Sequence, residues 1–180
     1  MNTIHHGFWT YFFFRKQKHL VKYYVFGSIL PDIIYYIMFL YMAIRYPLEE
    51  DTFDLHSIVH QMFDHPIVIV LRQLGHSIIV WIVLMIITIM LSKWKLSPWK
   101  AVLYGWFGHI IIDLFTHVRD AVPILYPLNE YIVRGPISYW DPDFYGREFS
   151  IIHSVFFVAA IFYLIVERVK IKKSKKRKEI

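Results

Sequence analysis

The chain contains no cysteine among its 180 residues. This absence excludes disulfide bonds, thiolate catalysis, cysteine-ligated zinc and iron–sulfur clusters. Any metal must therefore be bound by histidine, aspartate or glutamate, a ligand set that suits zinc, with manganese as the alternative. The ten histidines and 14 acidic residues are the side chains from which such a site could be built.

Charged residues are also scarce, at 19% of the chain, whereas 57% of the residues are hydrophobic and the mean hydropathy is +0.41. A soluble domain of this length is less apolar, so the composition predicts several membrane spans. The net charge of +6 comes from the C-terminal end. We interpret residues 170–180 as a basic cytoplasmic tail that touches anionic lipid head groups, because it directly follows an apolar run. The sequence contains no nucleic-acid-binding module.

Four apolar runs are long enough to cross the bilayer, and they predict an all-α, integral membrane bundle of about four transmembrane helices. Residues 1–169 form one membrane-embedded domain in this interpretation. Basic residues lie between the second and third runs and after the fourth, which predicts cytoplasmic termini and a cytoplasmic middle loop. The other two loops are acidic and are predicted to lie outside the inner membrane of a bacterial cell. The runs are Tyr23–Tyr46, Pro66–Leu91, Ala101–Phe115 and Phe149–Val166.

The most informative motif is the series His109, Asp113 and His117 within the third run. Residues four apart lie on one face of a helix, so two imidazoles and a carboxylate point the same way. Ionisable groups inside a membrane are costly unless they are paired, hydrated or bound to a metal. We interpret the motif as a metal site; interhelical hydrogen bonding is the alternative.

Two further polar residues, Asp32 and His76, are predicted to lie at the same depth as His109. At about 1.5 Å per residue, Asp32 and His76 lie roughly 15 Å from the nearer ends of their runs, and His109 roughly 13 Å from Lys100. Asp32 follows Pro31, which opens the helix locally. Arg72 lies one turn from His76, where it either holds a phosphoryl group or pairs with Asp32. Together these residues predict a polar column in the bundle, where helix bundles build metal sites.

Other histidines have two interpretations each. His56, His60 and Asp64, with His65 adjacent, form either a lid or second metal half-site, or simply a solvated amphipathic helix. His153 is either a partner of a metal ligand or an interfacial residue.

The order of four motifs over about residues 27–128 resembles the bacterial membrane-bound metal-dependent hydrolase family, and more distantly the zinc-dependent phospholipase C fold. The family also has a histidine near the N-terminus, where this chain has His5 and His6. These two residues reach the site only if Phe8 to Phe14 re-enters the bundle. The motifs are Leu30-Pro31-Asp32, Arg72-x3-His76-Ser77, Gly105-x3-His109-x3-Asp113-x2-Thr116 and Pro123-Ile-Leu-Tyr-Pro127-Leu.

Three positions depart from the family pattern. Leu71 replaces a histidine, Gly75 replaces a threonine, and Ile34 replaces an acidic residue. A ligand missing at Leu71 is replaced by His117 or by one of His56 and His60. Otherwise the site binds less metal or lacks catalytic activity.

The resemblance and the residue types imply a metal-dependent hydrolase that uses a metal-activated water. Asp32 and Arg72 are the catalytic residues that this implies: Asp32 would either bridge a second metal ion or take the proton of the water, and Arg72 would stabilise a phosphoryl group. The location in the membrane implies a lipid or lipid-linked phosphoester as substrate, with membrane lipids as partners. Three alternatives remain open: an ion or proton transporter with a buried Asp/Arg/His relay, a haem protein ligated by His76 and His109, and an inactive partner-binding scaffold. The implied metal ligands are His5, His6, Asp32, His76, His109, Asp113 and His117.

Overall fold

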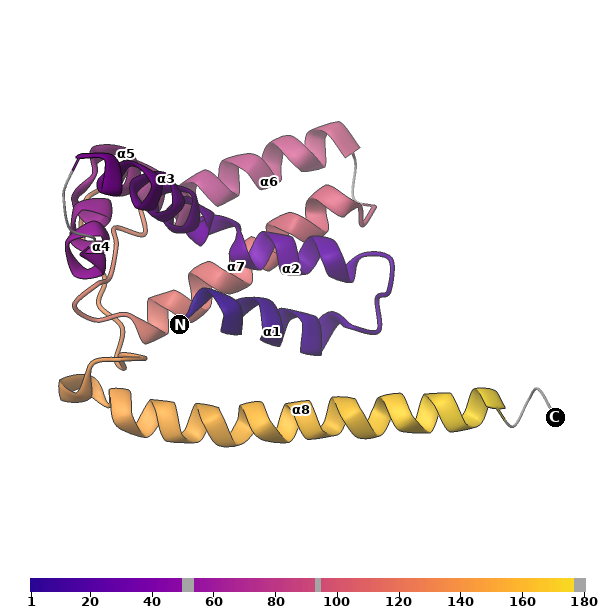
Figure 1. Ribbon diagram of the computed structural model, residues 1–180. Helices are drawn as coiled ribbons and strands as arrows, with labels where there is room; N and C mark the ends of the chain where they lie inside the picture. Colours follow the sequence, from indigo (N-terminus) through magenta and orange to yellow (C-terminus); the bar gives the residue numbers. More distant parts are fainter. Residues whose placement is uncertain (50–53, 93–94, 177–180) are drawn as a thin grey trace. The chain divides into compact units, whose positions relative to one another are not determined.

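A computed structural model describes residues 1–49, 54–92 and 95–176 and confirms the predicted all-α class. Glu50 and Asp51 of the predicted acidic loop, Lys93 and the end of the basic tail lie outside the described residues. The chain forms two compact units, Met1–Pro136 and Ile137–Ile180. The first contains α1 (Thr3–Phe14), α2 (Val21–Ile29), η1 (Leu30–Asp32), α3 (Ile33–Glu49), α4 (Leu55–Asp64), α5 (Pro66–Gly75), α6 (Ile78–Ser92) and α7 (Pro98–Thr116); the second contains η2 (Pro142–Phe144) and α8 (Gly146–Lys176) (Figure 1).

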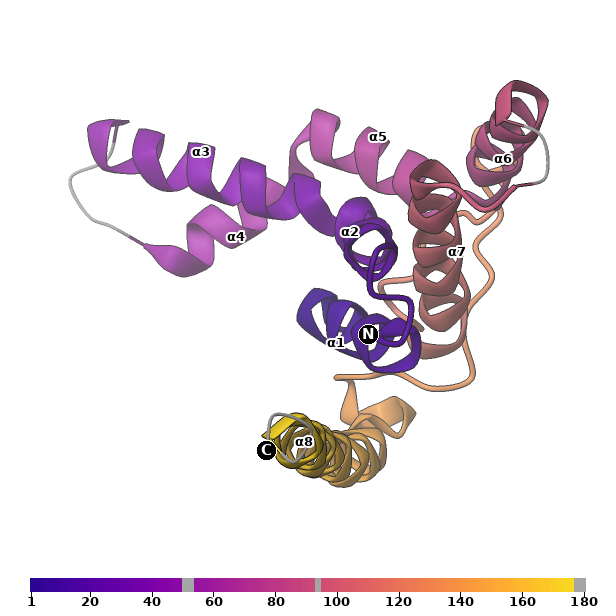
Figure 2. The same cartoon turned by 90° about the vertical axis from the view of Figure 1, so that its right-hand side faces the viewer.

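Two glycines allow α2 and α7 to cross with their backbones in contact. A Cβ atom on Gly27 would lie 1.9 Å from the carbonyl oxygen of Val102, and one on Gly105 would lie 2.0 Å from that of Tyr24. Figures 1 and 2 show α1, α2 and α7 side by side. Small residues at such crossings let membrane helices approach closely. The crossing fixes the position of the polar residues on α7 relative to α2.

The opposite side of α7 packs against α6. Met85 of α6 forms a hydrophobic cluster with Leu103, Trp106 and Ile110 of α7. The indole N–H of Trp81 donates to the carbonyl oxygen of Leu103 at 2.7 Å. Because α7 is covered on both sides, ten of its residues are buried, including His109 and Asp113.

The prediction that Pro31 opens the first apolar run is confirmed. Leu30, Pro31 and Asp32 form the 3-10 turn η1 between α2 and α3, and the whole segment Val21–Arg45 remains apolar and long enough to span a membrane. Proline removes one backbone donor from the helix, and the turn accommodates this loss. Asp32 is consequently placed at an interruption in the middle of a candidate span.

The second run is not the single continuous helix predicted from Pro66 to Leu91. It consists of α5 and α6, which are bent by 59° at residues 76–77. The Ser77 hydroxyl accepts from the N–H of Val80 at 3.2 Å, as a residue preceding a helix does. The sequence Gly75-His76-Ser77 contains this capping signal, but the apolar residues on both sides of it predicted one continuous helix. The bend places His76 between two helices.

By length and composition, two helices of the described chain could cross a membrane, or three if the bent pair counts as one span. The fourth predicted run is one of them, Gly146–Lys175 of α8. The third predicted run does form a helix, α7, but α7, which carries Lys100, His109 and Asp113, is not among these candidates.

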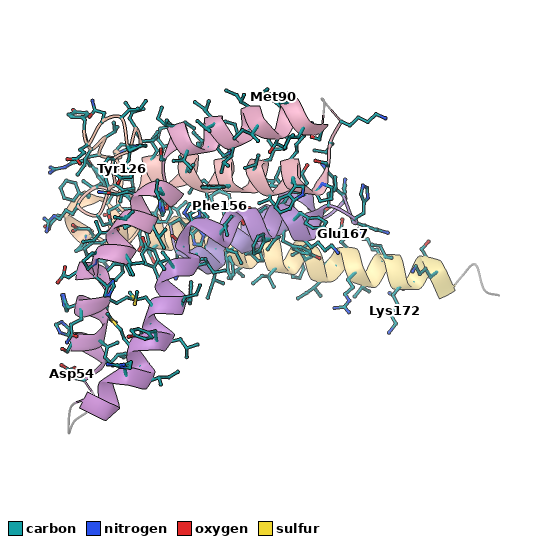
Figure 3. The ribbon with its side chains drawn as sticks, turned by 90° about the horizontal axis from the view of Figure 1, so that it is seen from above. Asp54, Met90, Tyr126, Phe156, Glu167 and Lys172 are labelled. Atoms are coloured by element: carbon teal, nitrogen blue, oxygen red, sulfur yellow. The ribbon has the colours of Figure 1, made fainter. Side chains whose placement is uncertain are left out.

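In the second unit, α8 continues through the start of the basic tail to Lys176. Figure 3 labels Phe156 in its apolar part and Glu167 and Lys172 in its charged part. The ring of His153 stacks between those of Phe149 and Phe157, with centroids 5.7 and 5.9 Å away. These aromatic contacts are all made within α8.

We expect cysteines introduced at Lys95 and Tyr131 to lie on opposite sides of the membrane, because α7 lies between them. Lys95 is exposed and Tyr131 is 71% exposed, so both positions are accessible to a reagent. In spheroplasts, an impermeant maleimide should label Tyr131→Cys and leave Lys95→Cys unlabelled. Both variants should react after permeabilisation, and the cysteine-free chain gives no background. Equal labelling of the two variants in spheroplasts would show that α7 does not cross.

Candidate metal centre

Four buried side chains from three parts of the fold meet in one cluster. Asp32 comes from η1, His76 from the bend between α5 and α6, and His109 and Asp113 from α7. Their residues are between 1% and 8% exposed. The sequence predicted that Asp32, His76 and His109 lie at the same depth, and in the structure these three residues lie next to one another.

The ligand atoms of His76, His109 and Asp113 lie close enough together to share one metal ion, and Asp32 lies next to both histidines. His109 Nε2 lies 3.1 Å from His76 Nε2, 3.1 Å from Asp113 Oδ2 and 3.6 Å from Asp32 Oδ1. His76 Nε2 lies 3.4 Å from Asp113 Oδ2 and 3.5 Å from Asp32 Oδ1. With metal–ligand distances of about 2.0–2.2 Å, the ligands of a tetrahedral zinc ion lie about 3.3–3.6 Å apart. The five distances are close to this range.

The other nitrogen of each histidine fixes the orientation of its ring. His109 Nδ1 donates to the carbonyl oxygen of Ser28 at 2.7 Å, and His76 Nδ1 donates to that of Arg72 at 2.8 Å. A carbonyl oxygen only accepts, so each Nδ1 carries a proton, and in a neutral ring Nε2 is left with a lone pair. The two lone pairs then face each other and two carboxylate oxygens. A cation between them would remove this repulsion, and hydrogen bonds of this kind typically orient metal-binding histidines.

The other carboxylate oxygen of Asp113 faces a second set of groups. Asp113 Oδ1 accepts from the amino group of Met1 at 2.7 Å, lies 2.8 Å from His6 Nε2 and lies 3.3 Å from His117 Nε2. The ring of His6 stacks on that of His109 with centroids 4.0 Å apart. His6, His109 and Asp113 thus form a second buried triad that could hold a metal ion, beside the triad of Asp32, His76 and His109.

The two outer histidines differ in their charge preference. Burial, together with the neighbouring His109, lowers the pKa of His6 to about 4, so its ring is neutral at neutral pH. Burial alone would also lower the pKa of His117, but hydrogen bonds with Asp113 and Asp120 outweigh it and the net shift is upward. His117 Nδ1 lies 2.8 Å from Asp120 Oδ2. His6 Nε2 also lies 3.0 Å from the backbone carbonyl oxygen of Met1, so in this arrangement it donates to that oxygen and to Asp113.

Four groups at the site were not identified from the sequence. The hydroxyl of Thr3 donates to Asp32 Oδ2 at 2.5 Å, the carbonyl of Ser28 orients His109, and the Thr116 hydroxyl accepts from the Met1 amino group at 2.9 Å. The fourth group is Asp120, which contacts His117 and lies in one of the two loops that the sequence showed only to be acidic. Only Thr116 had a signal, since it ends the Gly105-x3-His109-x3-Asp113-x2-Thr116 motif.

Arg72 lies beside the cluster without pairing with Asp32. Its guanidinium donates to the backbone carbonyl of Asp120, while the carboxylate of Asp32 contacts Thr3, His76 and His109. Arg72 is only partly buried. Of the two roles predicted for Arg72, this arrangement favours the one in which its remaining N–H groups are available to a substrate.

The structure brings together six of the seven predicted metal ligands: His6, Asp32, His76, His109, Asp113 and His117. The seventh, His5, belongs to neither triad found among the described residues. His6 reaches the cluster because α1 lies alongside α2.

The remaining candidate residues lie elsewhere. His56 and His60 are exposed on α4, where their Nε2 atoms lie 3.1 Å apart. His65 precedes α5, and its Nδ1 accepts from the N–H of Ile67 at 3.3 Å. Leu71 is 41% exposed and lines an apolar pocket. Of the replacements considered for a histidine at position 71, His117 is therefore the one that lies at the cluster.

Comparison with known proteins identifies one relationship. A family model described as YdjM inner membrane protein matches residues 7–173. The match includes the bend at His76 and the whole of α7. Of the residues at the cluster, Met1, Thr3 and His6 precede the matched range and the others lie within it. No curated protein matches the chain, and no solved structure matches it either.

Proposed function

The chain belongs to the YdjM inner membrane protein family, and from that premise we propose that it is a membrane-embedded metal-dependent hydrolase. The observation that carries this proposal is the spacing of His76, His109 and Asp113, whose ligand atoms lie 3.1–3.4 Å apart, with Asp32 Oδ1 3.5–3.6 Å from both histidines. Two neutral imidazoles and one carboxylate would hold a divalent cation and leave a fourth position for water. The donor set suits zinc.

The same spacing disfavours a haem. Axial ligands bind on opposite faces of a porphyrin, so His76 Nε2 and His109 Nε2 would have to be separated by the macrocycle. They are 3.1 Å apart, and Asp113 Oδ2 is within 3.4 Å of both.

A bound divalent ion would supply a water activated as a nucleophile near neutral pH. Asp32 is the base in this proposal, because the Thr3 hydroxyl holds its Oδ2 while Oδ1 faces the two histidines. Asp113 orients the site by contacting His109 through one oxygen and His6 through the other. Arg72 stabilises the charge that develops on a phosphoryl group.

We propose a lipid or lipid-linked phosphoester as the substrate. Asp32 lies in the middle of a candidate membrane span, and His76 lies at the break in a second. A substrate that reaches these residues has to enter from the membrane or from a polar path beside Arg72. A lipid could use both routes, because its hydrocarbon chains stay in the membrane while its phosphoester enters the polar path beside Arg72.

Replacing Arg72 with lysine tests the hydrolase against the transporter. Lysine keeps the charge but loses the planar fork that binds two phosphoryl oxygens. Loss of a charge-assisted hydrogen bond costs about 1.5–3 kcal/mol, so turnover should fall about ten- to a hundredfold. Metal content, measured on the same samples, should not change because Arg72 is not a ligand. The assay is release of phosphate or head group from a panel of lipid phosphoesters in detergent micelles.

Two results would count against this proposal. Full turnover by Arg72→Lys would remove Arg72 from the catalytic residues. If the unmodified, metal-loaded protein released nothing from any phosphoester, the hydrolase itself would be refuted, and a charge relay through the cluster would be the better explanation.

A further inference from the structure

An apolar pocket of about 280 Å³ lies next to the cluster. Its walls come from η1 and α3 on one side and from α5, α6 and α7 on the other. The volume is at the small end of the range for ligand pockets, which begins at about 300 Å³. The lining residues are Leu30, Pro31, Ile33, Ile34, Ile37, Leu71, Leu74, Gly75, Val80 and Trp106.

The pocket and the cluster share a wall. Pro31 and Gly75 line the pocket, and the residues that follow them, Asp32 and His76, belong to the cluster. The two wall segments are closely packed, since a Cβ on Gly75 would lie 3.1 Å from the carbonyl oxygen of Pro31. Trp106 donates its indole N–H to the carbonyl of Gly75 and so fixes the third side. An occupant of the pocket is thus held one residue away from two candidate ligands.

The pocket has little to hold water. Its lining side chains are aliphatic except for Trp106, whose N–H is already donated to Gly75. An ordered water needs two to four polar partners. At the rim, Ile33, Ile37 and Leu71 are 36%, 58% and 41% exposed. They belong to helices that are long and apolar enough to be membrane spans, and in a membrane these helices would be surrounded by lipid hydrocarbon.

We propose that this pocket binds a hydrocarbon chain of the lipid substrate and thereby places the phosphoester at the cluster. This inference rests on the proposed hydrolase function and specifies its substrate: a lipid with an acyl or prenyl chain, rather than a soluble phosphoester. The hydrocarbon chain is recognised only through burial of its apolar surface, so its length and shape matter more than its chemical groups. The head group is recognised separately by the polar residues of the site.

Photo-crosslinking tests the occupant directly. The unmodified protein is reconstituted in phosphatidylglycerol vesicles that contain an analogue with a diazirine at the end of one acyl chain, and crosslinked peptides are mapped by mass spectrometry. We expect crosslinks to be enriched at Ile34, Leu71 and Leu74 relative to the lipid-exposed face of α6. Leu74→Trp should fill the pocket and remove this enrichment. Ile87→Trp is the matched control, because Ile87 is 46% exposed on α6 and does not line the pocket.

Kinetics provide the second measurement. The ratio of turnover on a long-chain phospholipid to turnover on a six-carbon-chain lipid with the same head group should fall about tenfold in Leu74→Trp, which corresponds to losing the burial of roughly two methylene groups. The ratio should be unchanged in Ile87→Trp. Metal content and thermal unfolding of both variants show whether they are folded.

The outcomes separate the inference from the function on which it rests. Uniform crosslinking over the exposed helices, or an unchanged turnover ratio in a folded Leu74→Trp protein, would overturn the pocket assignment while hydrolysis stands. Crosslinks confined to the pocket, in a protein that hydrolyses no phosphoester, would confirm a lipid-binding pocket and refute the proposed reaction.

Discussion

His109→Ala and Asp113→Ala are each expected to abolish metal retention in detergent-purified protein. His109 Nε2 lies within 3.6 Å of three other ligand atoms, and Asp113 contacts the cluster through both of its oxygens. Each change removes a bond that water cannot replace at the same geometry. Elemental analysis should give near-stoichiometric metal in the unmodified protein and less than about a tenth of that in either variant, since removing one protein ligand weakens metal binding more than the 10–100-fold typical of its supporting partners.

His19→Ala is the control for this experiment. It also removes an imidazole, but His19 is exposed in the loop between α1 and α2. Its metal content should equal that of the unmodified protein. All three variants should insert and purify, because membrane insertion depends on the apolar residues of the spans. Full metal content in both cluster variants would refute the ligand assignment.

Gly105→Ala is expected to destabilise the protein severely, whereas Gly108→Ala on the same helix is not. The new methyl group on residue 105 would lie 2.0 Å from the carbonyl oxygen of Tyr24 and 3.0 Å from the backbone nitrogen of Ser28. A rigid backbone cannot move aside as a side chain does, so the helices must separate. Overpacking typically costs about 1–3 kcal/mol, and we expect a value at or above the top of this range.

Gly108 has no atom within 4 Å of the position of an added Cβ. Alanine is favoured over glycine in a helix by about 1 kcal/mol, so Gly108→Ala should be neutral or stabilising. Thermal unfolding in detergent measures both changes. Separation of α2 from α7 also breaks the hydrogen bond from His109 to Ser28, so Gly105→Ala should lose metal as well. Similar unfolding temperatures for the two variants would contradict the close crossing.

Several features of the site could be predicted because they depend on local spacing. The four-residue periodicity of His109, Asp113 and His117 does bring their side chains together, even though α7 ends at Thr116 and His117 has an extended backbone. Pro31 does interrupt the first span. Helical periodicity and proline geometry act within a few residues, so no tertiary information was needed.

The features that escaped prediction arise from tertiary contacts. The partner of His109 is a backbone carbonyl of Ser28, 81 residues away, and every residue has such a carbonyl. Asp120 was indistinguishable from other acidic loop residues until the fold placed it beside His117 and Arg72. The bend at His76 has only a weak capping signal, Ser77, inside a long apolar run that by itself favours one continuous helix.

The bend in the second span has a consequence for the life of the protein in the cell. The clustered groups lie on segments as far apart as His6 and Asp113, which are 107 residues apart in sequence. They come together only after all these segments have packed, so an ion bound at the cluster would favour the assembled chain. An ion present at a thousand times its dissociation constant would stabilise the assembled state by about 4 kcal/mol. Metal supply would then set how much of the newly made protein escapes membrane proteolysis, and its abundance would follow the metal status of the cell.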